Sequence, residues 1–184
     1  MLCCQAVLNS CLKYFHGNPY LSWFGRFSPI LDICGVSYHD GTACHLDLVQ
    51  STTDPVWSGL SKSNQALYIA NDSWFLIQQL SNHNIRKVLL NGRSVVDNFC
   101  KIFGLTLNKS SHHGTLRQPF DIFTGQLNLN GRIIEVCGWN INIQSSHIKG
   151  GAPTAAIAAV LASLCHSAHS LQNDQCIAHD QTRS

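Results

Sequence analysis

The spacing of apolar residues predicts two helices and then a strand in the first part of the chain. From 4 to 15 the apolar positions recur every three or four residues, which is typical of an amphipathic helix. The same spacing predicts a second helix from 19 to 33, kinked or broken at Pro29 because proline cannot donate a helical hydrogen bond. The stretch 41–50, GTACHLDLVQ, predicts a short buried strand that opens into a turn.

The centre of the chain alternates between helical and strand patterns. Asp72 is expected to cap a helix that carries apolar residues over 75–80. The apolar run RKVLLNG ends at Asn91–Gly92, as a buried parallel strand does. Helical spacing returns over 95–103. Residues 105–119 are polar and rich in Ser, His and Gly, so they are expected to form an exposed loop.

The last third of the chain predicts a hairpin and a final helix. Asn130–Gly131 is a type I′ turn signal between two strand-like runs. After Pro153 a single apolar face continues to Leu171. This order of elements predicts a single α/β domain over 1–171, a three-layer sandwich with a mostly parallel central sheet flanked by helices. Residues 172–184 are expected to form a polar tail.

Composition narrows the class of protein without choosing a function. The 184 residues are 45% hydrophobic and 12% charged, which indicates a folded globular protein. The formal net charge of +2 permits a local basic patch but does not by itself predict a polyanion partner. Nine cysteines contain no C-x-x-C pair and no secretory signal opens the chain, so we expect reduced thiols in a cytoplasmic, nucleoid or nuclear protein that is not secreted. The adjacent Cys–His pairs have poor metal-ligand spacing, and no apolar run is long enough to span a bilayer.

Polar side chains follow each of the three predicted strands at the point where the strand ends. These ends are Asp47–Gln50, Asn91–Arg93 and Gln144–His147. Ligands of open α/β sheets bind beyond the carboxyl ends of the strands, so we expect a site where these segments meet.

The same segments carry a resemblance to a known family. HLDLVQSTTDP, the helical NDSWFLIQQLSNHNI, the strand and helix RKVLLNGRSVVDNF, a hairpin, and NINIQSSH followed by a helix occur in this order. Over about residues 20–170 the chain resembles the uracil-DNA glycosylase superfamily. It is most similar to the branch in which one strand ends in an Asn-containing run, the next in a glycine that feeds a helix, and the last in His-Pro-Ser.

The resemblance implies base excision: the enzyme flips a damaged base out of DNA and hydrolyses its N-glycosidic bond. Asp47 falls where the family has its base-reading asparagine. Ser145, Ser146 and His147 fall on the His-Pro-Ser loop, which places His147 beside the departing base. DNA is the implied partner, and no metal or organic cofactor is implied.

The chain departs from the family in three ways. An ionised Asp47 only accepts hydrogen bonds, whereas asparagine also donates, so a base edge that presents donors is favoured. The loop at 145–147 has no proline, and its histidine comes last instead of first. The family's first strand, with its Gly-rich loop and water-positioning residue, has no counterpart because the chain opens with a helical pattern. These departures favour an alternative, a catalytically inactive, truncated homologue that acts as a nucleic-acid-binding or interaction module.

Each candidate residue also has an ordinary structural interpretation. His147 could be a solvent-exposed or helix-capping residue, and Asp47 could form a salt bridge. Asn91 most simply satisfies the turn before the helix, and Arg93 could hold a phosphate at the start of that helix. A small α/β hydrolase has little support because the chain has no G-x-S-x-G motif.

Overall fold

The protein is described by a computed structural model that covers residues 13–17, 20–112, 119–145 and 151–163. The chain groups into two compact units. The first comprises 1–44, 114–117 and 143–184, and the second comprises 45–113 and 118–142.

The regular secondary structure in the described part of the first unit is helical. Its N-terminal half contains α2 (Tyr14–Gly17), α3 (Leu21–Phe24), the 3-10 helix η1 (Gly25–Phe27) and α4 (Ser28–Ile33). The helix predicted with a kink or break at Pro29 is interrupted just before this residue, by the 3-10 helix η1. Pro29 itself occupies the first turn of α4, where its missing N–H has no helical partner to lose. Residues 152–163 are also helical, as expected after Pro153. Most of the helix predicted over 4–15 and the tail at 172–184 lie outside the described residues.

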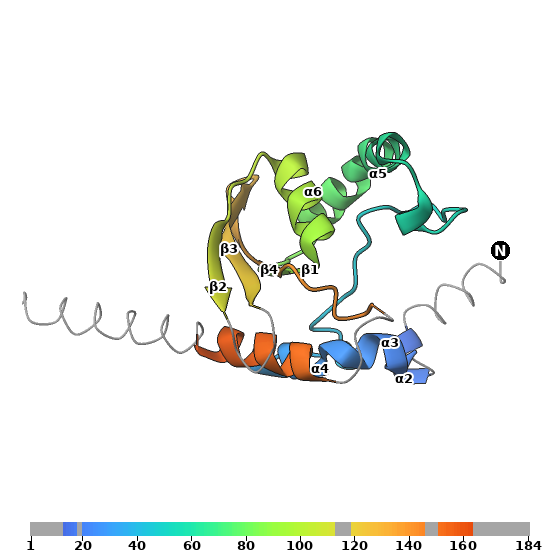
Figure 1. Ribbon diagram of the computed structural model, residues 1–184. Helices are drawn as coiled ribbons and strands as arrows, with labels where there is room; N and C mark the ends of the chain where they lie inside the picture. Colours follow the sequence, from blue (N-terminus) through green and yellow to red (C-terminus); the bar gives the residue numbers. More distant parts are fainter. Residues whose placement is uncertain (1–12, 18–19, 113–118, 146–150, 164–184) are drawn as a thin grey trace, which may run out of the picture. The chain divides into compact units, whose positions relative to one another are not determined.

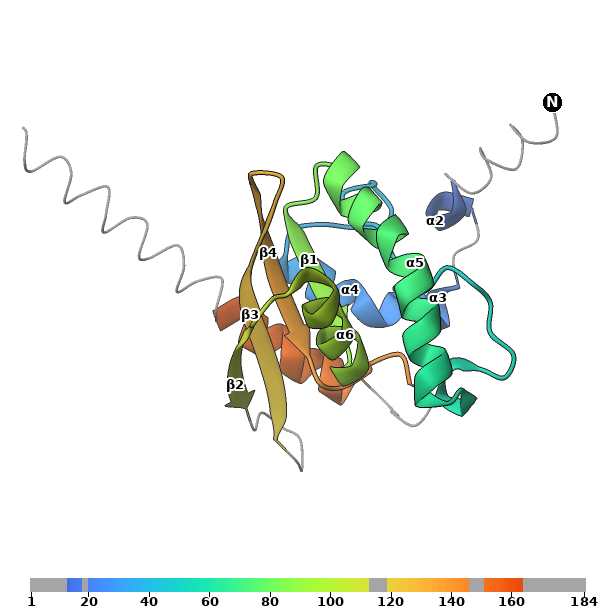
Figure 2. The ribbon, with the colours of Figure 1, turned by 90° about the horizontal axis from the view of Figure 1, so that it is seen from above.

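The second unit is built on a four-stranded sheet (Figures 1 and 2). Its strands are β1 (Lys87–Asn91), β2 (Asn108–His112), β3 (Phe120–Leu129) and β4 (Arg132–Trp139), in the order β1-β4-β3-β2. The predicted turn at Asn130–Gly131 joins β3 to β4, and both residues have the positive φ that a type I′ turn requires (52° and 78°). The fold is therefore α/β, with a mixed sheet.

The expectation of a mostly parallel sheet is wrong for the described strands. Only β1 and β4 pair in parallel, whereas β3 pairs with β4 and β2 pairs with β3 in antiparallel fashion. The reason is that the described strands contain one helical crossover, through α6 (Arg93–Phe103), and it leads from β1 to β2 at the far edge of the sheet. The rest of the sheet is a hairpin extended by one further antiparallel strand.

The strand predicted over 41–50 is also absent. These residues belong to no sheet ladder, although Leu46 and Leu48 are partly buried against the core. The alternation of apolar and polar residues that suggested a strand is therefore real. It reflects an extended segment lying on the core, without a neighbouring strand to pair with.

One hydrophobic core joins both long helices to one face of the sheet. The 3-10 helix η2 (Trp57–Gly59) leads into α5 (Lys62–Asn82), which lies beside α6 on that face (Figures 1 and 2). The core comprises Leu76, Leu80, Leu90, Val96, Phe99, Phe123, Leu127, Ile134 and Val136. Gly138 allows α6 to approach closely, since a Cβ atom there would lie 2.8 Å from Val96 Cγ2.

The sequence-based prediction that Asp72 caps a helix is wrong. The N-cap of α5 is Ser61, whose side chain accepts a hydrogen bond from the backbone N–H of Asn64. Asp72 lies in the middle of α5, and its Oδ2 accepts the backbone N–H groups of Gln50 (2.7 Å) and Ser51 (3.1 Å). The carboxylate thus anchors the extended segment instead of a helix terminus.

The polar stretch 105–119 is only partly a loop. Its residues Asn108–His112 form the edge strand β2, and 113–118 lie outside the described part of the chain. Four of the five β2 residues are exposed, so the apolar alternation that identifies a strand from sequence is missing. A polar edge strand of this kind discourages pairing with other chains.

Arg132 ties the end of α5 to the hairpin, and its loss should destabilise the protein. Its guanidinium donates to the backbone carbonyls of Leu80, Ser81 (2.9 Å) and His83 (2.7 Å), and the first two belong to the last turn of α5, where no helical N–H reaches them. We expect Arg132→Met, which keeps the aliphatic stem, to lower the free energy of unfolding by about 1–2 kcal/mol. Urea denaturation followed by tryptophan fluorescence measures this change.

Arg132→Lys is the matched control for this prediction. Lysine keeps the positive charge near the helix C-terminus but cannot reach two carbonyls from two nitrogens. We expect it to recover less than half of the loss. An unchanged stability of Arg132→Met would show that these hydrogen bonds contribute nothing in solution.

Candidate functional site

The best-defined polar site in the second unit is the junction between β1 and α6. β1 ends at Asn91, and Gly92 follows in a backbone conformation (φ 101°, ψ 151°) that is essentially restricted to glycine. Backbone hydrogen bonds join this junction to the end of β4: Gly92 N donates to Trp139 O (3.0 Å), and Arg93 N donates to Asn140 O (3.3 Å). The carboxyl ends of the two parallel strands are therefore held side by side.

The carboxamide of Asn91 bridges the two strand ends. Its Oδ1 accepts a hydrogen bond from Trp139 Nε1 (3.0 Å), and its Nδ2 donates to Asn142 Oδ1 (2.9 Å). Trp139 is fully buried, so its indole N–H needs an acceptor within the protein. These contacts support the structural interpretation of Asn91, which satisfies groups around the turn.

Arg93 stands at the first position of α6, and its guanidinium is already paired. Its Nε lies 2.9 Å from both carboxylate oxygens of Asp97, one helical turn later. The guanidinium carbon also lies 5.3 Å from the centre of the Phe123 ring, within range of a cation–π contact. The Arg93 side chain is 55% exposed, so a phosphate could still reach it from solvent.

A second polar cluster, which the sequence did not identify, surrounds Asp121 on β3. The carboxylate accepts hydrogen bonds from the Ser111 hydroxyl (2.7 Å) and Asn140 Nδ2 (3.2 Å), and it pairs with Lys109 Nζ (3.1 Å). The Ser111 hydrogen bond is the main reason that the pKa of Asp121 lies below its ordinary value. Asp121 is therefore an ionised, well-satisfied carboxylate at the same end of the sheet as Asn91.

No single-residue pattern could have revealed this cluster. Asp121 directly precedes a run of apolar residues, and Asn140 and Asp121 meet only because β3 and β4 pair in one register. The Asn140 amide oxygen also accepts the backbone N–H of Asp121 (3.0 Å), so the two residues fix each other.

Asp47 lies on the extended segment that precedes α5, and it pairs with a neighbouring histidine. His45 Nε2 lies 3.5 Å from Asp47 Oδ1, and the Asp47 side chain is 69% exposed. The hydrogen bond with His45 is the main cause of a lowered pKa for Asp47. Asp47 is thus ionised at neutral pH, and its carboxylate pairs with His45.

The other predicted site residues are in the first unit. The carbonyl of Ser145 accepts a hydrogen bond from Arg26 Nη1 (3.2 Å), as does the carbonyl of Ile143 (2.9 Å). Arg26 was not identified from the sequence, yet it fixes the backbone that leads into the predicted loop. Ser146 and His147 lie outside the described residues.

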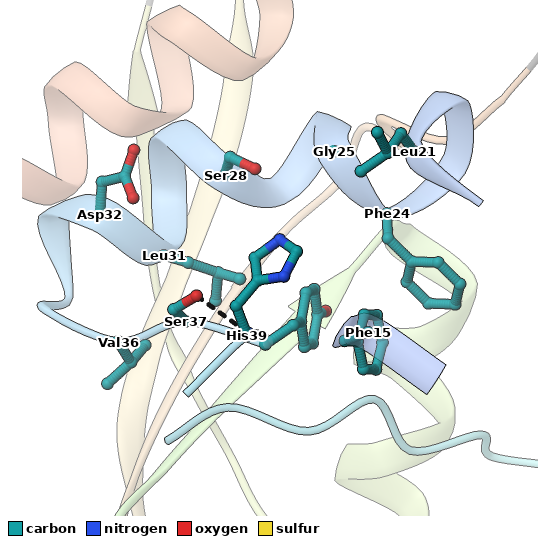
Figure 3. A pocket seen from close by; sticks show the side chains of 11 residues that line it. Phe15, Leu21, Phe24, Gly25, Ser28, Leu31, Asp32, Val36, Ser37 and His39 are labelled. Atoms are coloured by element: carbon teal, nitrogen blue, oxygen red, sulfur yellow. Dashed lines mark hydrogen bonds between the residues drawn. The ribbon is translucent and has the colours of Figure 1, made fainter. Parts of the chain in front are cut away.

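The first unit also contains a shallow pocket next to α4 (Figure 3). Figure 3 shows the Phe15 and Phe24 rings on one side of the pocket and the Asp32 carboxylate on the other. Phe15 stacks on Tyr38 at 4.6 Å, and burial raises the pKa of Tyr38 to about 12. The volume of about 40 Å³ has room for a few water molecules.

Metal and membrane sites are not found in the described part of the chain. Within those residues, no three His, Cys, Asp or Glu side chains gather as metal ligands would. Likewise, no described helix combines the length and apolar character needed to cross a bilayer.

Comparison with known proteins assigns the chain to no family. No family model matches it, and neither a curated protein nor a solved structure matches it.

Proposed function

We propose that the chain is a DNA glycosylase-like protein with a fold similar to the uracil-DNA glycosylase superfamily. It would hydrolyse the N-glycosidic bond of a flipped, damaged base such as uracil. The observation that supports this proposal most is the β1–α6 junction, where a strand ends in Asn91 and a Gly92 in a glycine-only conformation feeds a helix. The junction stands at the carboxyl end of a parallel strand pair, which is where α/β proteins bind ligands.

In the proposed mechanism, water adds to the sugar carbon as the C–N bond to the base breaks. The electron pair of that bond leaves with the base as an anion, and His147 in the loop 145–147 stabilises the anion electrostatically. The proton that the attacking water loses passes to solvent, and the released base takes up a proton from solvent. The base edge is held near Asp47. Because the pKa of Asp47 is lowered by His45, its carboxylate accepts hydrogen bonds and selects a base edge that presents donors. The mechanism uses no metal or organic cofactor.

A panel of damaged duplexes tests the enzyme proposal. The full chain is incubated with duplexes that carry uracil, hypoxanthine or another damaged base, and abasic sites are revealed by alkaline cleavage. We expect one lesion to be excised and an undamaged duplex to remain intact. Absence of abasic sites across the panel, with folding verified by circular dichroism, would overturn the enzyme proposal.

Two observations favour the second candidate function, an inactive homologue that acts as a nucleic-acid-binding or interaction module. Both polar atoms of the Asn91 carboxamide are engaged inside the protein. Asp47 is mostly exposed and paired with His45, which is the environment of a surface ion pair and not of a base-binding pocket. This candidate predicts that the protein binds DNA without excising any base.

Arg93 and Asp97 provide a test of DNA binding that does not require catalysis. If Arg93 contacts a phosphate, Arg93→Gln should weaken binding to a duplex and reduce the salt slope of log K by about 1. Asp97→Asn should instead strengthen binding, since it releases the guanidinium from a carboxylate 2.9 Å away. Fluorescence anisotropy of a labelled duplex at several salt concentrations measures both effects.

The ion pair Lys87–Glu135 is the matched control. These side chains lie 3.1 Å apart and pair β1 with β4 at the opposite end of the parallel strands. Lys87→Gln removes one positive charge, as Arg93→Gln does, and Glu135→Gln removes one negative charge, as Asp97→Asn does. If they shift DNA affinity by as much as the Arg93 and Asp97 variants, binding follows total charge and not the junction.

A further inference from the structure

The pocket beside α4 in the first unit combines an apolar wall with one carboxylate (Figure 3). Phe24, Leu31 and Val36 form much of the apolar wall, and Asp32 supplies the carboxylate. The described residues that line the pocket include no lysine or arginine. The pocket therefore presents a negative charge next to hydrocarbon, with no positive charge of its own.

The Asp32 carboxylate has no partner in the described part of the chain. No lysine, arginine or histidine there forms an ion pair with it, and no group there donates a hydrogen bond to it. Asp40, a nearby acid in the sequence, differs in this respect, since its Oδ1 accepts the backbone N–H of Thr42 (2.8 Å). Asp32 is thus the acid of this region that is left to pair with something else.

The position of Asp32 in its helix also disfavours an unpaired negative charge. The helices α3, η1 and α4 follow one another without a gap from Leu21 to Ile33, and Asp32 lies in the last turn. The final carbonyl groups of a helix carry partial negative charge, so a carboxylate beside them is repelled. A cation bound at Asp32 would neutralise the carboxylate and relieve this repulsion.

We propose that the pocket binds the alkylammonium end of a lysine side chain from a partner protein. The ammonium group pairs with Asp32, and the methylene stem lies against the apolar wall, as lysine stems do on apolar surfaces. A volume of about 40 Å³ holds about three or four water-sized groups. This number matches the ammonium nitrogen and the last two or three carbon atoms of lysine.

Large apolar side chains exposed next to the pocket indicate that the lysine belongs to a protein. Tyr20 and Leu21 are each 62% exposed, and Trp23 is 40% exposed. Leu21 lines the pocket, and the other two are within two residues of it in the sequence. Tyrosine and tryptophan are enriched in protein interfaces, and a free amine would leave these side chains uncovered. Nucleic acid is disfavoured because Asp32 repels phosphate.

NMR titration of the full chain with two peptides tests the proposal. One is acetyl-Gly-Leu-Lys-Leu-Gly-amide, and the other has norleucine in place of lysine, which keeps the carbon stem without the ammonium. We expect the lysine peptide to bind about three- to fivefold more tightly and to shift the amide signals of residues 28–39. Asp32→Asn should weaken the lysine peptide by the same factor and leave the norleucine peptide unchanged, because only the charge pair is lost.

Asp97→Asn is the matched control for charge. It removes one negative charge from α6 in the second unit, so it should leave the affinity for both peptides unchanged. Propylammonium is the control for the exposed side chains around the pocket. It should bind more weakly than the lysine peptide, because it is too short to cover Tyr20 and Trp23.

Four results would contradict the proposal. Equal affinities of the lysine and norleucine peptides would show that binding is apolar only. Equal losses in Asp32→Asn and Asp97→Asn would show that total charge attracts the peptide. Propylammonium that binds as tightly as the lysine peptide would assign the pocket to a free amine. An unchanged spectrum of the folded protein with up to about 20 mM lysine peptide would show that Asp32 binds no lysine.

Discussion

Gly92→Ala is expected to lower the free energy of unfolding by about 2–4 kcal/mol, which is a large fraction of the stability of a small protein. At φ 101° and ψ 151°, a side chain collides with its own backbone in a way that glycine avoids. The added Cβ would also lie 3.2 Å from Cβ of Asn142, the residue that accepts a hydrogen bond from Asn91. Strain and crowding therefore act on the same junction.

Gly104 is the matched control for Gly92, because it also has a positive φ at an end of α6. Its conformation (φ 59°, ψ 33°) is the left-handed region that other residues can reach, and a Cβ there meets no atom within 4 Å. We expect Gly104→Ala to cost about 1 kcal/mol. Urea denaturation of the three proteins gives the comparison. Equal losses in the two variants would mean that the β1–α6 junction is not strained.

The elements that the sequence predicted correctly are those with local signals. β1 has a continuous apolar run closed by Asn91–Gly92, and α6 has a clear apolar face. The hairpin has Asn130 and Gly131, whose positive φ angles close a tight turn. In each case the determining interactions lie within a few residues of one another, so the pattern in the sequence and the structure carry the same information.

The errors arise where the outcome depends on distant partners. The segment 41–50 has the alternation of a strand, yet a strand exists only if another strand offers its edge. β2 is the converse: it pairs with β3 although its residues are polar and exposed. The direction of pairing has the same origin, since nothing local specifies that β2 and β3 run antiparallel in an α/β chain.

The candidate site residues show the same difference between local signals and long-range contacts. Asn91 and Arg93 were found because ligands of α/β proteins bind at strand ends, and the structure does place them at such an end. Asp121 and Asn140 were missed because their relationship depends on the register of β3 against β4. The cation–π contact of Arg93 also depends on tertiary packing, because it joins α6 to Phe123 on β3. The roles assigned to Asp47, Ser145, Ser146 and His147 remain predictions.

His147→Ala is expected to reduce base excision about 100-fold or more while leaving stability almost unchanged. Loss of a group that stabilises developing charge typically costs two to three orders of magnitude in rate, about 3–4 kcal/mol in the barrier. If His147 acts only in catalysis, its loss should change the free energy of unfolding by less than about 0.5 kcal/mol. Single-turnover excision rates and urea denaturation, measured on the same preparations, separate the two effects.

His83→Ala is the control, because His83 is exposed just before β1, at the end of the strand opposite Asn91. It removes an imidazole without touching the carboxyl ends of the parallel strands, so excision should continue at the original rate. A parallel loss of rate and stability in His147→Ala would instead assign this histidine a structural role. That result would favour the second candidate function, an inactive nucleic-acid-binding or interaction module. DNA affinity that depends on Arg93 would then be the measurement that tests it.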